Sequence, residues 1–233
     1  MVMKSSRIIL GCLISIMFAA AASAQWTPVT DTVLVTSLPG GTLIVGDKEF
    51  SGFNLDVITV DGGVTLPDPD LMTVQGVQDV GTGDYGLRFN GVSWNVVSNQ
   101  LITIDLSFKV AVLPGYDEYI KDVRLYLTGA GATGTGLVSA GENVWDDFPG
   151  GSAIASLTCS KQDGDGGANL SDYAEFTPMK EIYIQTKHIS VTGGANGTAH
   201  FSEFFQFYSQ VPEPATITLV GFAGAILLRR RRA

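Results

Sequence analysis

The sequence is poor in the side chains that catalytic and metal sites use most often. It has two histidines, His188 and His200, and two cysteines in 233 residues. Both histidines lie in β-like segments, no Gly-x-Ser-x-Gly elbow is present, and a zinc site needs three or four protein ligands. We therefore expect no enzyme of the serine-hydrolase, cysteine-hydrolase or zinc classes, and predict a non-enzymatic protein. A glycosidase remains an open alternative, because the spacing of its two carboxyl groups exists only in the fold.

Cysteine is also too scarce for a disulfide framework. Cys12 lies in an N-terminal segment that we predict is removed, which leaves Cys159 without an intramolecular partner. Cys159 ends the apolar, strand-like run AIASLTC, so we predict a buried and inert thiol.

Positive charge is scarce outside the two ends of the chain. Of the 14 lysines and arginines, two precede residue 25 and four follow residue 214, whereas all 23 acidic residues lie between them. Residues 25–214 therefore carry eight positive and 23 negative side chains, a net charge of −15. Such a chain is repelled by nucleic acid and by anionic lipid headgroups. We expect no nucleic-acid partner; cations or a neutral polysaccharide suit this charge.

The N-terminus has the composition of a secretory signal peptide over residues 1–24. Lys4 and Arg7 precede an apolar run over residues 8–22, and Ala22-Ser23-Ala24 forms a small-x-small cleavage site before Gln25. This order predicts export and cleavage by signal peptidase after Ala24.

The C-terminus, residues 211–233, has three parts. The motif Val211-Pro212-Glu213-Pro214 comes first, an apolar run over residues 215–228 follows, and the last part is Arg229, Arg230, Arg231 and Arg232. The run has 14 residues, whereas a membrane-spanning helix needs about 20. Arginines next to it resist translocation, so we predict a short helix that stops in the membrane transiently. A permanent tail anchor is the alternative.

This tail resembles the PEP-CTERM sorting signal of Gram-negative bacteria that make exopolysaccharide. The resemblance implies that an exosortase, a membrane transpeptidase, recognises the Pro-Glu-Pro motif and cuts there. It also implies membrane contact through the C-terminal segment before processing, and delivery to the outer surface or matrix, or secretion.

Residues 25–210 read as one all-β domain. In the segment from Leu101 to Leu113, even-numbered positions from Ile102 to Val112 are apolar and most odd-numbered positions are polar, which predicts a half-buried antiparallel strand. Many short strands joined by Gly-rich turns indicate an antiparallel β-sandwich with jelly-roll or Greek-key connections.

Three local features of these strands are also predicted. Asn90-Gly91 is the two-residue signature of a type I′ hairpin. A change of phase near Lys187 indicates a β-bulge. In the last strand four apolar side chains should share one face, with Glu203 as an exception: Ala199, Phe201, Phe205 and Phe207.

The acidic segment KQDGDGGANLSDYAEF, residues 161–176, is a candidate calcium loop. Its spacing puts oxygen-bearing side chains at positions 3, 5, 9 and 12 of such a loop: Asp163, Asp165, Asn169 and Asp172. Hard cations take six to eight oxygen ligands. The run GDGGANLSDY resembles the calcium loop of dockerin modules, although Lys161 stands at position 1, where that pattern has Asp. A polar loop between two strands is the alternative.

Aromatic faces can stack on sugar rings, and Trp145, in the acidic loop-like stretch ENVWDDFPGG, is the candidate ligand-binding residue. We expect an exported, non-enzymatic cell-surface or extracellular-matrix protein associated with exopolysaccharide. The alternatives are a carbohydrate-binding module, with or without calcium dependence, and a secreted polysaccharide-active enzyme.

Overall fold

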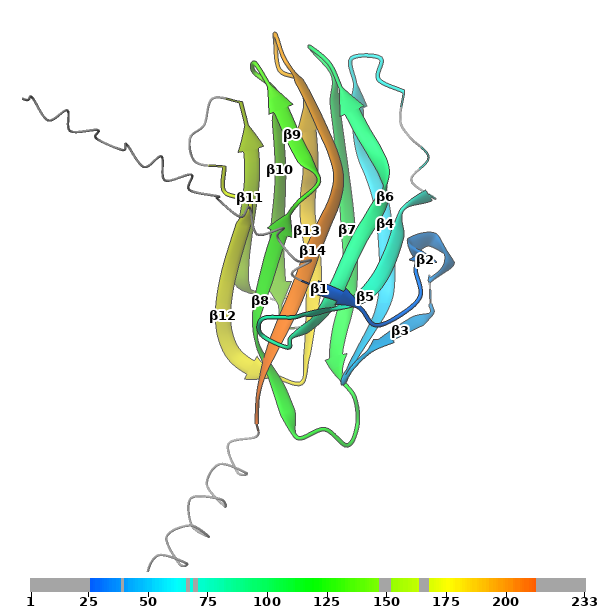
Figure 1. Ribbon diagram of the computed structural model, residues 1–233, viewed down its shortest axis with the longest axis vertical. Helices are drawn as coiled ribbons and strands as arrows, with labels where there is room; N and C mark the ends of the chain where they lie inside the picture. The colour runs from blue at the N-terminus through cyan, green and yellow to red at the C-terminus, as the bar shows by residue number, and fades with distance from the viewer. Residues whose placement is uncertain are drawn as a thin grey trace, which may run out of the picture.

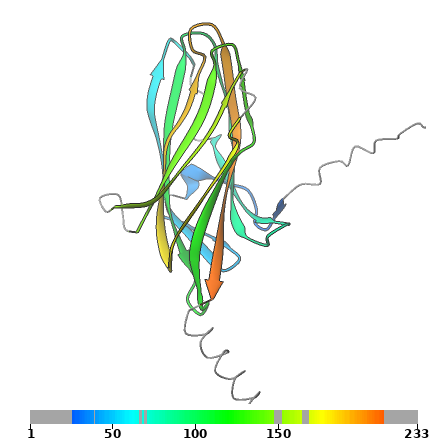
Figure 2. The ribbon, with the colours of Figure 1, turned by 90° about the vertical axis from the view of Figure 1, so that its left-hand side faces the viewer.

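The computed structural model describes residues 26–38, 40–65, 68, 71–146, 152–163 and 168–212. These residues form two antiparallel β-sheets packed face to face, seen from two perpendicular directions in Figures 1 and 2. The predicted β-sandwich is confirmed. The chain passes repeatedly from one sheet to the other, so neighbours within a sheet are mostly distant in sequence.

The first sheet, sheet A, contains in spatial order β1 (Trp26–Pro28), β5 (Thr73–Asp79), β6 (Tyr85–Val96), β14 (Thr198–Pro212), β8 (Glu118–Leu127) and β12 (Ser171–Met179); β2 (Val33–Leu34) also pairs with β5, and β9 (Ala130–Thr133) with β14. The second, sheet B, contains β11 (Ala153–Gln162), β10 (Leu137–Trp145), β13 (Glu181–Thr192), β7 (Leu101–Val112), β4 (Lys48–Asp61) and β3 (Thr42–Val45). A 3₁₀ turn, η1 (Val35–Ser37), follows β2.

Strand β7 has the facing that its alternation predicts. The even-numbered side chains from Ile102 to Val112 are all buried in the core between the sheets. β7 is central to sheet B, because β13 pairs with one of its edges and β4 with the other. The bulge predicted near Lys187 is also present, as a register shift between Thr186 and Ile189.

The predicted hairpin at Asn90-Gly91 is wrong, because β6 continues through both residues. Opposite them the register with β14 shifts: Trp94 pairs with Phe201 and Asn90 with Glu203. β6 thus has more residues than β14 between these two pairs. Gly91 lies within this β-bulge, an irregularity where glycine is also favoured, and not in a turn.

Strand β14 extends to Pro212. Val211 and Pro212 therefore belong both to the last strand and to the predicted sorting motif. Across the residues that the structure describes, no helix is long and apolar enough to span a membrane; the predicted tail helix lies outside them.

Candidate functional site

The outer face of sheet A carries a second apolar cluster, separate from the core. On β14, Phe204 and Tyr208 pack into the core, whereas Phe205 and Phe207 belong to a cluster with Val77 on the opposite side of the strand. Successive side chains of a strand point to opposite faces, so a small aromatic cluster lies on the outer face of sheet A. Phe205 and Phe207 are 2% and 4% exposed, because the partly buried rings of Trp26 and Tyr126 pack against them.

The last-strand prediction is therefore half wrong. Ala199 and Phe201 face the core, but Phe205 and Phe207 face outward, because the register shift between Phe201 and Glu203 reverses the phase of the strand. The sequence did contain a signal for this reversal, since Glu203 broke the apolar pattern at the residue where the shift occurs.

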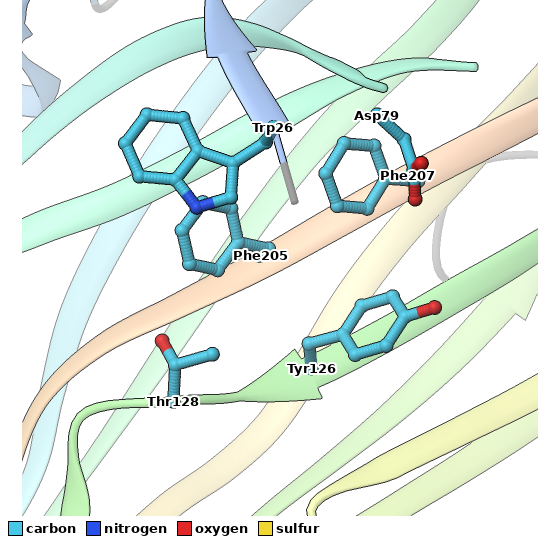
Figure 3. A pocket seen from close by; sticks show the side chains of 6 residues that line it. All are labelled: Trp26, Asp79, Tyr126, Thr128, Phe205 and Phe207. Carbon is cyan, nitrogen blue, oxygen red and sulfur yellow. The ribbon is translucent and has the colours of Figure 1, made fainter. Parts of the chain in front are cut away.

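These rings line a shallow hollow of about 100 Å³, together with Trp26, Asp79, Tyr126 and Thr128. Figure 3 shows the indole of Trp26 beside Phe205, with Tyr126 and Thr128 across the hollow. Ring centroids are 5.1 Å apart for Trp26 and Phe205 and 5.9 Å apart for Tyr126 and Phe207. This volume is below that of ligand pockets, which are about 300–1,000 Å³, so a ligand would rest on the hollow and would not be enclosed by it.

A glycine makes room for one of these rings. Gly86 of β6 lies directly opposite Phe207 in the sheet. A Cβ atom at Gly86 would lie 2.7 Å from Cδ1 of Phe207 and 2.0 Å from the backbone oxygen of Gln206. Any larger residue at position 86 would displace the Phe207 ring and change the hollow.

Arg88 and Arg124, the two arginines of the described chain, flank the aromatic cluster. In the sheet register Arg88 is opposite Phe205, and Arg124 is opposite Phe207. The guanidinium of Arg88 lies 4.7 Å from the ring centre of Trp26, and its Nε donates to Glu203 Oε2 at 2.7 Å. This ion pair and the cation–π contact fix one wall of the hollow.

Arg124, on β8, lies between the aromatic cluster and β12. Its guanidinium lies 5.5 Å from the ring centre of Tyr173 and its Nη2 atom 3.7 Å from Asp84 Oδ2. Partial burial disfavours its charge, but Asp84 and Asp122 outweigh that effect and raise the pKa of Arg124. The positive charge of the surface is thus balanced locally by carboxylates.

The polar groups of the hollow already have protein partners. Asp79 Oδ1 accepts from the backbone N–H groups of Gly81 and Thr82 at 2.7 and 3.1 Å. Thr128 Oγ1 donates to Glu203 Oε1 at 2.8 Å. These bonds orient the side chains before any ligand arrives. The arrangement can present the partly exposed rings of Trp26 and Tyr126, supported by buried Phe205 and Phe207, to a ligand.

Trp145, the tryptophan that the sequence favoured, is not part of this hollow. It ends β10 in sheet B, opposite Ala153 and Tyr183, and its Nε1 atom is buried with no hydrogen-bond partner among the described residues. Its role in ligand binding stays a prediction. The tryptophan of the hollow is Trp26, the first described residue, and only its aromatic character pointed to it in the sequence.

The described part of the candidate calcium loop uses its polar side chains within the fold. Asp163 Oδ2 accepts from the backbone N–H of Gly134, and Asp172 Oδ2 from that of Thr158, both at 2.7 Å. The side-chain nitrogen of Asn169 donates to the backbone oxygen of Thr158. Asp165 lies outside the described residues. Across all described residues, including those of this loop, no three His, Cys, Asp or Glu side chains could together hold a metal ion.

The remaining predicted site residues belong to the two ends. Val211 and Pro212 are paired in β14. The others lie outside the described residues: Ala22, Ala24, Gln25, Glu213, Pro214, Arg229, Arg230, Arg231 and Arg232.

Comparison with known families confirms the resemblance of the tail. Residues 210–232 match the family described as PEP-CTERM protein-sorting motif. No curated protein sequence matches the chain.

Three solved structures are similar in part. TmCBM61, solved in complex with beta-1,4-galactotriose, is 17% identical over 68% of this chain and 90% of its own, with a TM-score of 0.30. The enzymatically active domain of bacteriophage CBA120 tailspike protein 4 is 15% identical over 66% of this chain and 19% of its own, with a TM-score of 0.25. A structure of carbohydrate-binding modules from the beta-sandwich super family is 11% identical over 74% of this chain and 57% of its own, with a TM-score of 0.25. At these TM-scores none of the three indicates a ligand for this chain.

Proposed function

We propose that this exported PEP-CTERM protein is a non-enzymatic component of the cell surface or matrix, and that its domain binds polysaccharide through the aromatic hollow on sheet A. The observation that carries the proposal is the outward-facing group of Trp26, Phe205, Phe207 and Tyr126. Trp26 and Tyr126 are partly exposed and pack against the buried Phe205 and Phe207, and an apolar patch on the surface of a folded domain marks an interaction site.

The chemistry of the hollow suits a sugar ring. The axial C–H groups of a pyranose carry partial positive charge, and the face of an aromatic ring is negative, so the two stack. Both Thr128 and Asp79 line the hollow; Thr128 is exposed and supplies an oxygen atom for a sugar hydroxyl group, whereas Asp79 is buried. Because the domain has a net charge of −15 over residues 25–214, a neutral polysaccharide is favoured over an acidic one.

Binding without hydrolysis is the form of the proposal that the lining favours. A retaining glycosidase uses two carboxyl groups about 5–5.5 Å apart across the scissile bond. Among the residues that line the hollow, Asp79 is the single carboxylate, and it holds the turn that follows β5.

The test is binding of the mature protein to an array of neutral and acidic glycans. We expect Trp26→Ala to abolish binding, because the indole forms one wall of the hollow. Trp26→Phe should retain part of it, because a ring remains. Trp145→Ala is the matched control, since it removes the same side chain from sheet B.

The outcome discriminates between the two tryptophans. Loss of binding with Trp145→Ala alone would place the site on sheet B and refute the proposal for the hollow. Hydrolysis of a bound glycan by the wild-type protein would refute the non-enzymatic part. Thermal unfolding of each variant shows whether the domain remains folded.

A further inference from the structure

The first residues of the sorting motif are part of a β-sheet. The family match begins at Gln210, and β14 ends at Pro212. In the pairing of β14 with β8, Gln210 is opposite Ile120, Val211 opposite Tyr119 and Pro212 opposite Glu118. The motif and the domain therefore share three residues.

These three residues are held on one side only. Tyr208, opposite Tyr85, is the last residue of β14 that pairs with β6; beyond it, β8 is the single partner among the described strands. Beside the open edge lies a polar hollow, whose lining includes Asp47, Lys48, Glu118 and Gln210. β14 ends there at one end of the sandwich, near the connection from β7 to β8 (Figures 1 and 2).

A boundary between a firmly held and a weakly held part of β14 lies at Ser209. The register shifts between Ser209 and Gln210. Ser209 is fixed to the buried carboxylate of Asp122, which accepts hydrogen bonds from both its backbone N–H and its hydroxyl. This clamp anchors the strand up to the shift.

Beyond Ser209 two features lower the cost of separation. Pro212 has no N–H to donate to the sheet. The side-chain nitrogen of Gln210 is buried without a hydrogen-bond partner among the described residues, and such a group regains hydration when it is released. Short strand ends with few hydrogen bonds open at low free energy.

The spacing makes contact with the processing enzyme unavoidable. Only Glu213 and Pro214 stand between Pro212 and the apolar run that begins at Ala215, and two extended residues span at most about 7 Å. An enzyme that cuts near Pro214 must therefore reach the end of the sandwich itself.

We infer that the sorting transpeptidase contacts this end of the sandwich, and that it takes the motif only after residues 210–212 have separated from β8. Ser209 is the hinge, and the polar hollow beside Gln210 is the space through which the enzyme reaches the open edge. The inference rests on the processing step of the proposed function and is independent of sugar binding.

A cross-strand disulfide tests the inference. Tyr119 and Val211 are directly opposite in an antiparallel pair, where Cα atoms lie about 4.5–5.5 Å apart, within the range of about 4.4–6.8 Å found for disulfides. In a host with the matching transpeptidase, we expect the full-length Tyr119→Cys/Val211→Cys protein to remain unprocessed. Reductant should restore processing, which is followed by intact mass.

Two controls separate locking from substitution. Each single-cysteine variant should be processed like the wild type. A second disulfide, Thr133→Cys/Thr198→Cys, joins opposite residues of β9 and β14 at the far end of the strand and should leave processing unchanged. If the disulfide of the Tyr119→Cys/Val211→Cys variant forms and processing continues at the wild-type rate, the inference is overturned.

A spacer gives an independent measurement. A four-residue spacer, Gly-Ser-Gly-Ser, inserted between Ser209 and Gln210 keeps the motif intact but removes it from the register with β8. We expect faster processing of this variant. An unchanged or slower rate would overturn the inference, the slower rate because the enzyme would then need the motif in the sheet. An unprocessed wild-type protein would instead refute processing itself.

Discussion

Glu142 of β10 and Gln206 of β14 are hydrogen-bonded through the core, from one sheet to the other. The amide nitrogen of Gln206 donates to Glu142 Oε2, and the hydroxyl of Tyr208 donates to Gln206 Oε1 at 3.3 Å. Glu142 is 2% exposed, and Gln206 and Tyr208 are fully buried. Burial raises the pKa of Glu142 to about 8, although the bond from Gln206 opposes the shift.

This carboxyl group should make the stability of the domain fall with rising pH. Its ordinary pKa is 4.5, so between about pH 4.5 and 8 the folded state holds a proton that the unfolded state has lost. The free energy of unfolding therefore decreases as pH rises through that window, by a few kcal/mol in total. We expect the melting temperature to fall between pH 5 and 9.

Glu142→Gln should remove most of this dependence. A glutamine oxygen can still accept from Gln206, and no charge develops in the core, so the variant should be more stable than the wild type at pH 9. Asp146→Asn, which removes an exposed carboxylate just after β10, is the matched control and should keep the wild-type slope. Equal slopes for wild type and Glu142→Gln would contradict the prediction.

Leu106→Ala should destabilise the domain by about 2–5 kcal/mol, because Leu106 is fully buried in the central strand β7 and its truncation leaves a cavity. Asp105→Ala, one residue away on the half-buried face of β7, should cost much less. Urea unfolding of both variants measures the difference; similar losses would show that packing across β7 does not depend on the face.

Calcium should stabilise the protein no more than sodium at equal ionic strength. Asp163 and Asp172 accept backbone hydrogen bonds, and Lys161 occupies the first position of the loop, so screening of negative charge is the expected effect. A calcium-specific rise in melting temperature would support the loop instead. In that case Asp165→Ala should remove the rise and Lys161→Asp should increase it.

The mature protein should begin at Gln25 and lack the segment after Pro214. Intact-mass measurement of the protein from the cell envelope and the medium checks both ends. Retention of Arg232 would show that the tail remains as an anchor. The N-terminal result also bears on the hollow, because cleavage after Ala24 leaves Trp26 as the second residue of the mature chain.

The sequence by itself determined the sorting signal at the C-terminus, the β-sandwich class and the course of strand β7, and it predicts the signal peptide at the N-terminus. The export and sorting signals depend on the order of a few side chains along the chain, and that order needs no fold. Strand β7 was equally readable, because its period of two continues without interruption from Ile102 to Val112. Patterns of this kind depend only on residues that are close together along the chain, so the sequence alone is enough to recognise them.

Tertiary structure decided which face each side chain of β14 occupies. One register shift at Phe201–Glu203 turned Phe205 and Phe207 outward, and pairing of β1 with β5 brought Trp26 over β14 from a position far away in sequence. The same shift placed Asn90-Gly91 in a bulge. Strand register depends on which strands pair and how they align, so residues distant in sequence formed the hollow, and periodicity along one strand could not locate it.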